Sequence, residues 1–181
     1  MRKVRNLACF KQAYLPAPKI GGQGVDVLKR FFTLGGRSMD FVVKTFSELS
    51  VDELYEILKS RAEVFLLEQN IVCQDMDDID RKSLHCFFYN GERVVAYLRA
   101  FPSGADSATI GRVLTLEHRK GMGSELVKRS IEKIKECLKV KKIYVHAQKQ
   151  AEKFYEKMGF NTVSGEYLEE GIVHVTMEYL I

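Results

Sequence analysis

Apolar residues recur along this chain with two different spacings, which predict strands alternating with helices. Runs rich in β-branched and aromatic residues predict strands, whereas apolar residues spaced three and four apart predict amphipathic helices. The predicted strands cover residues 41–46, 84–89, 93–101, 109–116, 143–147, 161–167 and 172–179. The predicted helices cover residues 51–66, the stretch that follows Gly123 and ends near Lys139, and residues 151–158.

Turn and cap signals separate these elements. Asn90-Gly91 predicts a tight hairpin between two strands. Ser50 and Glu53 have the spacing of a capping box at the start of the first helix. The order of the elements predicts an α/β (α+β) fold, in which a mixed sheet of six to seven strands has helices packed on it.

The first helix carries one apolar face that ends near a carboxylate. This face holds Leu54, Ile57, Leu58, Ala62, Phe65 and Leu66. The apolar stretch 65–67 leads directly to Glu68. We expect Glu68 to be partly buried there, which would make its carboxylate a stronger base.

Residues 1–38 differ in composition from the rest of the chain. They hold eight Lys/Arg and one acidic residue, a net charge of +7, whereas residues 39–181 hold 20 Lys/Arg and 23 Asp/Glu, a net charge of −3. Pro16, Pro18 and two glycine pairs predict a flexible basic extension before a single domain over residues 39–181. The overall charge of +4 therefore does not indicate nucleic-acid binding, because it comes from the extension.

The cysteine pattern and the hydropathy favour a cytoplasmic protein. The four cysteines are far apart and form no C-x-x-C pair, so we expect reduced thiols in place of a disulfide framework. No uncharged apolar run approaches the ~20 residues of a membrane helix, and the basic start lacks the apolar stretch of a signal peptide. We expect no membrane or nucleic-acid partner, and either a monomer or a homodimer.

The segment from Ile110 to Leu126 has the pattern of an anion-binding loop. A strand leads into a short loop rich in glycine and cations, and a helix follows. The N–H groups of such a loop and of the helix start form a positive cradle, beside which Arg119 and Lys120 add full charges. A pyrophosphate suits this site, although a plain tight turn with solvated cations is the alternative. The glycine spacings of a Walker loop and of a Rossmann fingerprint are absent.

The segment from Ala151 to Phe160 contains a candidate proton donor. Ala151, Phe154, Tyr155 and Met158 have the spacing of one core-facing helix stripe. A phenol with a pKa of ~10 can also protonate a leaving thiolate whose conjugate acid has a pKa of ~8–9. Both roles, core residue and acid, therefore stay open for Tyr155.

Together these two segments resemble the GCN5-related N-acetyltransferase (GNAT) family over about residues 39–181. More narrowly the chain resembles the ElaA-type branch. That resemblance rests on Arg61-Ala-Glu-Val-Phe-Leu-Leu-Glu-Gln69, on Asp75, Asp77 and Asp80 followed by His85, on Ile110-Gly-Arg-Val113, on Ala147-Gln148 and on Glu169-Glu-Gly-Ile-Val-His174. It implies helices on both faces of the sheet and a cleft where two neighbouring parallel strands splay, near residues 113–116 and 143–147.

The resemblance implies that acetyl-CoA enters this cleft as the cosubstrate. Its pantetheine arm would pair with the backbone of Val113, Leu114, Thr115 and Leu116, and its pyrophosphate would rest on Arg119, Lys120, Gly121, Met122, Gly123 and Ser124. Tyr155 matches the tyrosine that in the family protonates the departing sulfur. The implied reaction is N-acetylation of a primary amine of a small molecule or peptide by direct attack on the thioester. An amide near Leu114 would stabilise the oxyanion.

One departure from the family pattern concerns the pyrophosphate loop. The family loop reads Q/R-x-x-G-x-G/A, whereas His118 holds the first position here and Arg119 lies one residue nearer to Gly121. The connection is therefore shortened by a residue or two. A CoA-binding sensor or interaction module with little catalysis is the alternative function.

Several residues are candidates for the remaining roles. The candidate general bases are Glu68, which we prefer, and Asp77, Asp80, Glu117 and His146. The candidate substrate contacts are Arg61, Gln69, Arg112 and His146, although a structural ion pair is the alternative for each arginine. The acidic stretch 75–80 either favours a cationic amine or caps a helix. The four histidines are widely separated, so we expect no metal site.

Overall fold

A computed structural model describes residues 32–34 and 37–181 of the chain. Most of the predicted basic extension therefore lies outside the described residues. Within them, strand β1 (Phe32–Leu34) pairs antiparallel with the start of strand β2 (Arg37–Thr45). The first predicted strand thus begins at Arg37, four residues before the expected residue 41.

Over the described residues, one nine-stranded mixed sheet forms the centre of the molecule. Its strand order is β1-β2-β3-β4-β5-β6-β9-β7, and β8 pairs with β9. The remaining strands are β3 (Leu84–Tyr89), β4 (Val94–Pro102), β5 (Ser107–Thr115), β6 (Lys142–Gln148), β7 (Asn161–Thr162), β8 (Tyr167–Glu169) and β9 (Ile172–Leu180). Strands β5 and β6 pair in parallel. The predicted mixed sheet is confirmed.

Two differences raise the strand number above the predicted seven. Strand β1 was not predicted, and the expected strand over residues 161–167 is divided into β7 and β8. Between them, the hydroxyl of Ser164 accepts a hydrogen bond from the amide of Thr176 on β9 at 2.8 Å. The Thr176 amide thus bonds to a side chain where a sheet would have a backbone carbonyl, so the pairing with β9 is interrupted between β7 and β8.

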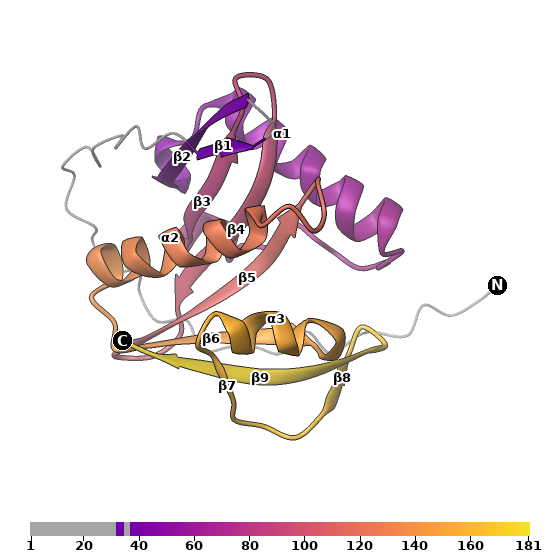
Figure 1. Cartoon of the computed structure of the whole chain (residues 1–181), viewed down its shortest axis with the longest axis vertical. Coiled ribbons are helices and arrows are strands. Elements are labelled where there is room, and N and C mark those ends of the chain that lie inside the picture. The colour runs from indigo at the N-terminus through magenta and orange to yellow at the C-terminus, as the bar shows by residue number, and fades with distance from the viewer. Residues whose placement is uncertain (1–31, 35–36) are drawn as a thin grey trace.

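Helices cover both faces of the sheet. Helix α1 (Val51–Arg61) packs on one face, where Ile57 meets Phe87 and Tyr97. Helices α2 (Met122–Leu138) and α3 (Glu152–Lys157) lie together in front of the other face in Figure 1. Because side chains alternate between the faces of a strand, Tyr97 belongs to the small core under α1, and its neighbour Leu98 belongs to the large core under α2.

Helix α1 starts as predicted but continues differently. The Ser50 hydroxyl accepts from the Glu53 amide at 3.1 Å, and the Glu53 carboxylate accepts from the Ser50 amide at 2.8 Å, which confirms the capping box. After Arg61 the chain continues as a π-helix, η2 (Ala62–Glu68). A π-turn holds more residues than an α-turn, so the apolar stripe changes direction. Val64 is buried, whereas Ala62 and Leu66 are exposed, contrary to the predicted face.

In the part of the chain that the structure describes, no helix is long and apolar enough to cross a membrane.

Candidate active site

Strands β5 and β6 separate part-way along their length. Their parallel pairing runs from Ser107 opposite Lys142 to Ile110 opposite Val145. Strand β5 nevertheless continues to Thr115 and β6 to Gln148. In the described sheet, backbone groups of β5 beyond Ile110 that face this opening are left without partners on β6. The predicted splayed pair is therefore confirmed.

A β-bulge lies where the two strands separate. Between Tyr97 and Arg99 on β4, the opposite residues on β5 change from Leu114 to Gly111, so β5 holds one extra residue. Arg112 sits in this bulge with a φ of 55°, a conformation that costs energy for any residue except glycine. Because a bulge bends its strand and increases the local twist, it accounts for the divergence of β5 from β6.

The backbone direction of β5 decides which residues face the opening. The Leu116 amide donates to the carbonyl of Val95 on β4 at 2.9 Å. Since backbone groups alternate in direction along a strand, those of Leu114 also face β4. The backbone groups of Val113 and Thr115 face the opening. Of the four residues predicted to pair with a pantetheine arm, Leu114 and Leu116 therefore have their backbone groups directed elsewhere.

The loop after β5 leads into an uncapped helix start. Gly121 occupies the N-cap of α2 with a φ of 78°, and no side chain of the described residues caps the first turn. The first amides of α2 are thus available to an anion, which the helix dipole also favours. Arg119 and Lys120 are exposed beside them, with the Lys120 ammonium 2.8 Å from the Glu117 carboxylate. This arrangement suits a phosphate group.

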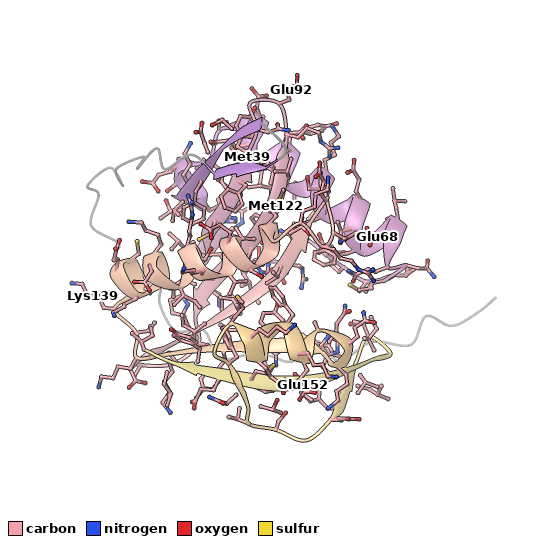
Figure 2. All side chains as sticks on the ribbon, in the orientation of Figure 1. Met39, Glu68, Glu92, Met122, Lys139 and Glu152 are labelled. Carbon is pink, nitrogen blue, oxygen red and sulfur yellow. The ribbon has the colours of Figure 1, made fainter. Side chains whose placement is uncertain are left out.

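Two residues at the end of η2 contact both borders of the opening. The Glu68 carboxylate lies 3.0 Å from Nε2 of His118, in the loop after β5. The side-chain Nε2 of Gln148, the last residue of β6, donates to Oε1 of Gln69 at 3.1 Å. Figure 2 shows Glu68 beyond the Met122 end of α2, whereas Lys139 lies at the far end of that helix.

The expected burial of Glu68 is wrong. Its side chain is 51% exposed, and the preceding Leu67 is also exposed. The π-helical turn is the cause, because it directs Leu66 and Leu67 away from the core that Val64 enters. Glu68 is therefore a solvated carboxylate beside His118 and does not end a buried apolar face.

Arg61 lies inside an ion-pair network and is 1% exposed. Its Nε lies 2.9 Å from Asp75 Oδ2, and its Nη1 lies 2.9 Å from Asp80 Oδ1. Its Nη2 also donates to the Asp75 carbonyl at 2.7 Å. This geometry is the structural ion pair that was the alternative to substrate binding.

Arg99, which the sequence did not single out, completes the network. It donates to both oxygens of Asp77, at 2.5 and 2.9 Å, and to Asp80 Oδ1 at 2.7 Å. Burial acts to raise the pKa of Asp77, but the hydrogen bonds and charge of Arg99, with the charge of Arg112, lower it overall. Asp77 and Asp80 are thus engaged as acceptors for arginines, which makes them poor general bases.

Arg112 connects this network to the bulge of β5. Its Nε lies 2.8 Å from Asp75 Oδ1 but is not directed at it, so this buried nitrogen has no hydrogen-bond acceptor among the described residues. Its Nη2 donates to the Asp75 carbonyl at 3.1 Å. Asp75, Asp77 and Asp80 therefore neutralise three arginines, and the acidic stretch does not present these charges to a cationic substrate.

Tyr155 is buried on the α3 side of the sheet, with 5% of its surface exposed. Its ring meets the edges of Phe154 and Phe160, with centroid distances of 5.0 and 5.6 Å. Burial raises the pKa of its phenol, so Tyr155 holds its proton at neutral pH. The Phe154 ring also lies close to Gly123 at the start of α2, which places the α3 aromatic residues beside the first turn of that helix.

The comparisons with known proteins now decide the family. A family model of the acetyltransferase (GNAT) domain matches residues 42–181. The chain belongs to the GNAT acetyltransferase family. Protein ElaA of Escherichia coli is 36% identical over 137 residues, which cover 72% of this chain and 90% of that protein.

Solved structures agree with this GNAT assignment. The crystal structure of Escherichia coli ElaA gives a TM-score of 0.73 at 31% identity and covers 78% of this chain and 99% of that one. An acyl-CoA N-acyltransferase from Pseudomonas aeruginosa gives a TM-score of 0.72 at 29% identity and covers 77% and 99%. UPF0039 protein C11D3.02c of Schizosaccharomyces pombe is 36% identical over 144 residues, 77% of this chain and 96% of that protein. The predicted GNAT fold and ElaA-like resemblance are confirmed.

His146 lies at the opening of this GNAT domain. It follows Val145, the last β6 residue paired with β5, and its side chain is exposed. Val145 and Ala147 enter the core under α2 and α3, so His146 faces the opposite side of the sheet. Its Nδ1 lies 2.6 Å from the hydroxyl of Tyr167 on β8.

Tyr167 and Thr176 complete this cluster and were not predicted. The Thr176 hydroxyl lies 3.4 Å from the Tyr167 hydroxyl and 3.5 Å from His146 Nδ1. The Tyr167 ring also stacks on His174, at 6.1 Å between centroids. Only the strand register brings these residues together, because His146 is opposite Thr176 and Tyr167 is opposite His174. Among the described residues, no group of three or more His, Cys, Asp or Glu is arranged to hold a metal ion.

Proposed function

We propose that this GNAT domain is an acetyl-CoA-dependent N-acetyltransferase that acetylates a primary amine of a small molecule or peptide. The observation that carries the proposal is the early end of β5–β6 pairing at Ile110 and Val145. It leaves an extended backbone edge beside an uncapped helix start. The amide groups of a pantetheine arm can hydrogen-bond to the backbone edge, and the negative charge of a pyrophosphate suits the helix start.

In the proposed complex, the pantetheine arm lies along β5 and pairs with the outward backbone groups of Val113 and Thr115. The pyrophosphate rests on the amides of residues 119–124, with Arg119 and Lys120 adding positive charge. Lys120 already has Glu117 at 2.8 Å, so a phosphate would compete with that exposed carboxylate. Such exposed pairs contribute about 0–1 kcal/mol, which makes the exchange inexpensive.

The reaction would be a direct attack of a neutral amine on the thioester carbonyl. An amide of Val113 or Thr115 would donate to the developing oxyanion. The C–S bond then breaks, and the sulfur takes a proton from Tyr155. Burial raises the pKa of this phenol, so it still holds its proton at neutral pH, but it is a weaker acid than a solvated phenol. Holding both reactants in the opening supplies the entropic part of the rate enhancement.

A thiol-release assay tests this proposal. Purified protein with acetyl-CoA and a panel of primary amines should release free CoA only when an accepted amine is present. Acetyl-CoA without amine is the control for hydrolysis. CoA binding without turnover for every amine would contradict the enzyme and favour the sensor or interaction module. Absence of any CoA binding would contradict both.

A further inference from the structure

The proposed acetyl transfer needs a group that removes a proton from the amine, because most primary amines are protonated at neutral pH. Asp77 and Asp80 accept hydrogen bonds from Arg99 and Arg61. Glu68 pairs with His118, and Glu117 pairs with Lys120, both on exposed surface beside the anion-binding turn. Each of these carboxylates thus has a cationic or histidine partner.

We propose that His146 is the general base of the acetyl transfer and that Tyr167 is the residue that orients it. This inference rests on the proposed function. His146 is the first residue of β6 beyond the paired region, so it lies at the border of the opening between β5 and β6. Within the described residues its Nε2 has no hydrogen-bond partner, whereas its Nδ1 contacts Tyr167 at 2.6 Å.

The proposed acid, Tyr155, and the proposed base, His146, lie on opposite sides of the sheet. Tyr155 lies on α3 and packs into the core that α2 and α3 cover. His146 points to the opposite side of the same sheet, as its exposure between buried Val145 and Ala147 shows. In the proposed complex, the opening between β5 and β6, whose pairing ends at Ile110 and Val145, connects these two sides. An amine can therefore approach from the His146 side while the thioester is held on the α2 and α3 side.

The proposed base role requires the Nδ1–H tautomer of His146, which its contact with Tyr167 accommodates. Thr176 donates to the Tyr167 hydroxyl oxygen at 3.4 Å, and we assign the Nδ1–H of His146 as a second donor to that oxygen. The lone pair of Nε2 is then free to accept a proton. Burial raises the pKa of Tyr167, which keeps its phenol neutral, and the phenol oxygen stabilises the imidazolium that forms.

The protons balance as follows. Nε2 of His146 takes one proton from the ammonium group, and the free amine forms a C–N bond to the thioester carbon. The C–S bond breaks with its electron pair on sulfur, which takes the Tyr155 proton and leaves as CoA thiol. The second proton of the attacking nitrogen is lost to water, from which Tyr155 regains a proton. His146 releases its proton to solvent, so one proton is produced for each amide formed.

The test compares His146→Gln with wild-type protein on two amines. For a basic alkyl amine, which is protonated at the assay pH, we expect kcat/KM to fall by about 10²-fold. For a weakly basic amine that is already neutral, the loss should be less than about 10-fold, because no proton must be removed before attack. His174→Gln is the matched control, since His174 stacks on Tyr167 but its Nδ1 lies 2.9 Å from the Ile172 carbonyl.

The outcomes separate the two proposals. A wild-type protein that acetylates no amine contradicts the proposed function and the base together. A wild-type protein that acetylates an amine while His146→Gln keeps full activity contradicts the base alone. Equal losses on both amines would also overturn it, because they would show that His146 only positions the substrate. Acetyl-CoA affinity should be unchanged in His146→Gln, which confirms that the variant is folded.

A spectroscopic measurement tests the role of Tyr167. The ¹⁵N chemical shifts of His146 should report the Nδ1–H tautomer in wild-type protein and a mixture of tautomers in Tyr167→Phe. The same variant should lower kcat and leave the KM for acetyl-CoA unchanged. Tyr144→Phe is the control, because Tyr144 lies on the same strand and side but bonds to Glu178. A wild-type Nε2–H tautomer would overturn the assignment.

Discussion

Asp80→Asn removes a negative charge that two buried arginines share. Asp80 Oδ1 accepts from Arg61 Nη1 at 2.9 Å and from Arg99 Nη1 at 2.7 Å, and the two arginines are 1% and 3% exposed. Removing one partner of a buried ion pair costs about 3–5 kcal/mol. Since Arg61 keeps Asp75 and Arg99 keeps Asp77, we expect a smaller loss, about 2–3 kcal/mol of unfolding free energy.

Urea unfolding and thermal unfolding measure this loss. For a domain of this size, about 2–3 kcal/mol corresponds to a Tm lower by roughly 5–10 °C. Asp78→Asn is the matched control, because Asp78 is 92% exposed and its ion pair with Arg81 is long, at 3.7 Å. It should change the unfolding free energy by less than about 0.5 kcal/mol. Equal stability of the two variants would refute the view that the network holds the loop and the β5 bulge in place.

Three further predictions concern single groups. Tyr155→Phe should lower kcat by about 10²-fold and leave acetyl-CoA affinity nearly unchanged, and an unchanged rate in the thiol-release assay would remove Tyr155 as the acid. Gly121→Ala should cost about 1–2 kcal/mol because Gly121 has a φ of 78°, and it should weaken acetyl-CoA binding in calorimetry, whereas Gly165→Ala should do neither. The pKa of Asp77 is lowered in the folded state, so its stabilising contribution is present above its unfolded pKa of ~3.9 and is lost as the pH falls through the folded value. In Asp77→Asn the free energy of unfolding should therefore fall less steeply than in wild-type protein as the pH is lowered. Equal pH dependence of the two proteins below about pH 5, measured by urea titrations, would contradict this.

Features set by neighbouring residues in the chain were predictable. The capping box of Ser50 and Glu53 formed, because both partners lie within one helical turn. The short helix expected over residues 151–158 also formed, as α3 over Glu152–Lys157, and Gly159 follows it with a φ of 92°. The order of strands and helices also predicted a mixed sheet, and the resemblance predicted its splayed pair.

Features that depend on distant residues were not predictable from the pattern. The π-helical turn after Arg61 changed which apolar residues are buried, and periodicity at α-helical spacing cannot show it. Arg99 reads as a lone cation within an apolar strand, yet it completes the ion pairs of Asp77 and Asp80. Tyr167 meets His146 only through the register of β9 with β6 and β8.

Residue-resolved amide hydrogen exchange, with and without acetyl-CoA, tests most directly whether the opening between β5 and β6 holds the cosubstrate. Acetyl-CoA should slow exchange at Val113 and Thr115, whose backbone groups face the opening, and at the first amides of α2 from Met122. Leu116 should change little, because its amide already donates to Val95 at 2.9 Å. Binding of acetyl-CoA without added protection at Val113, Thr115 and the start of α2 would contradict this placement.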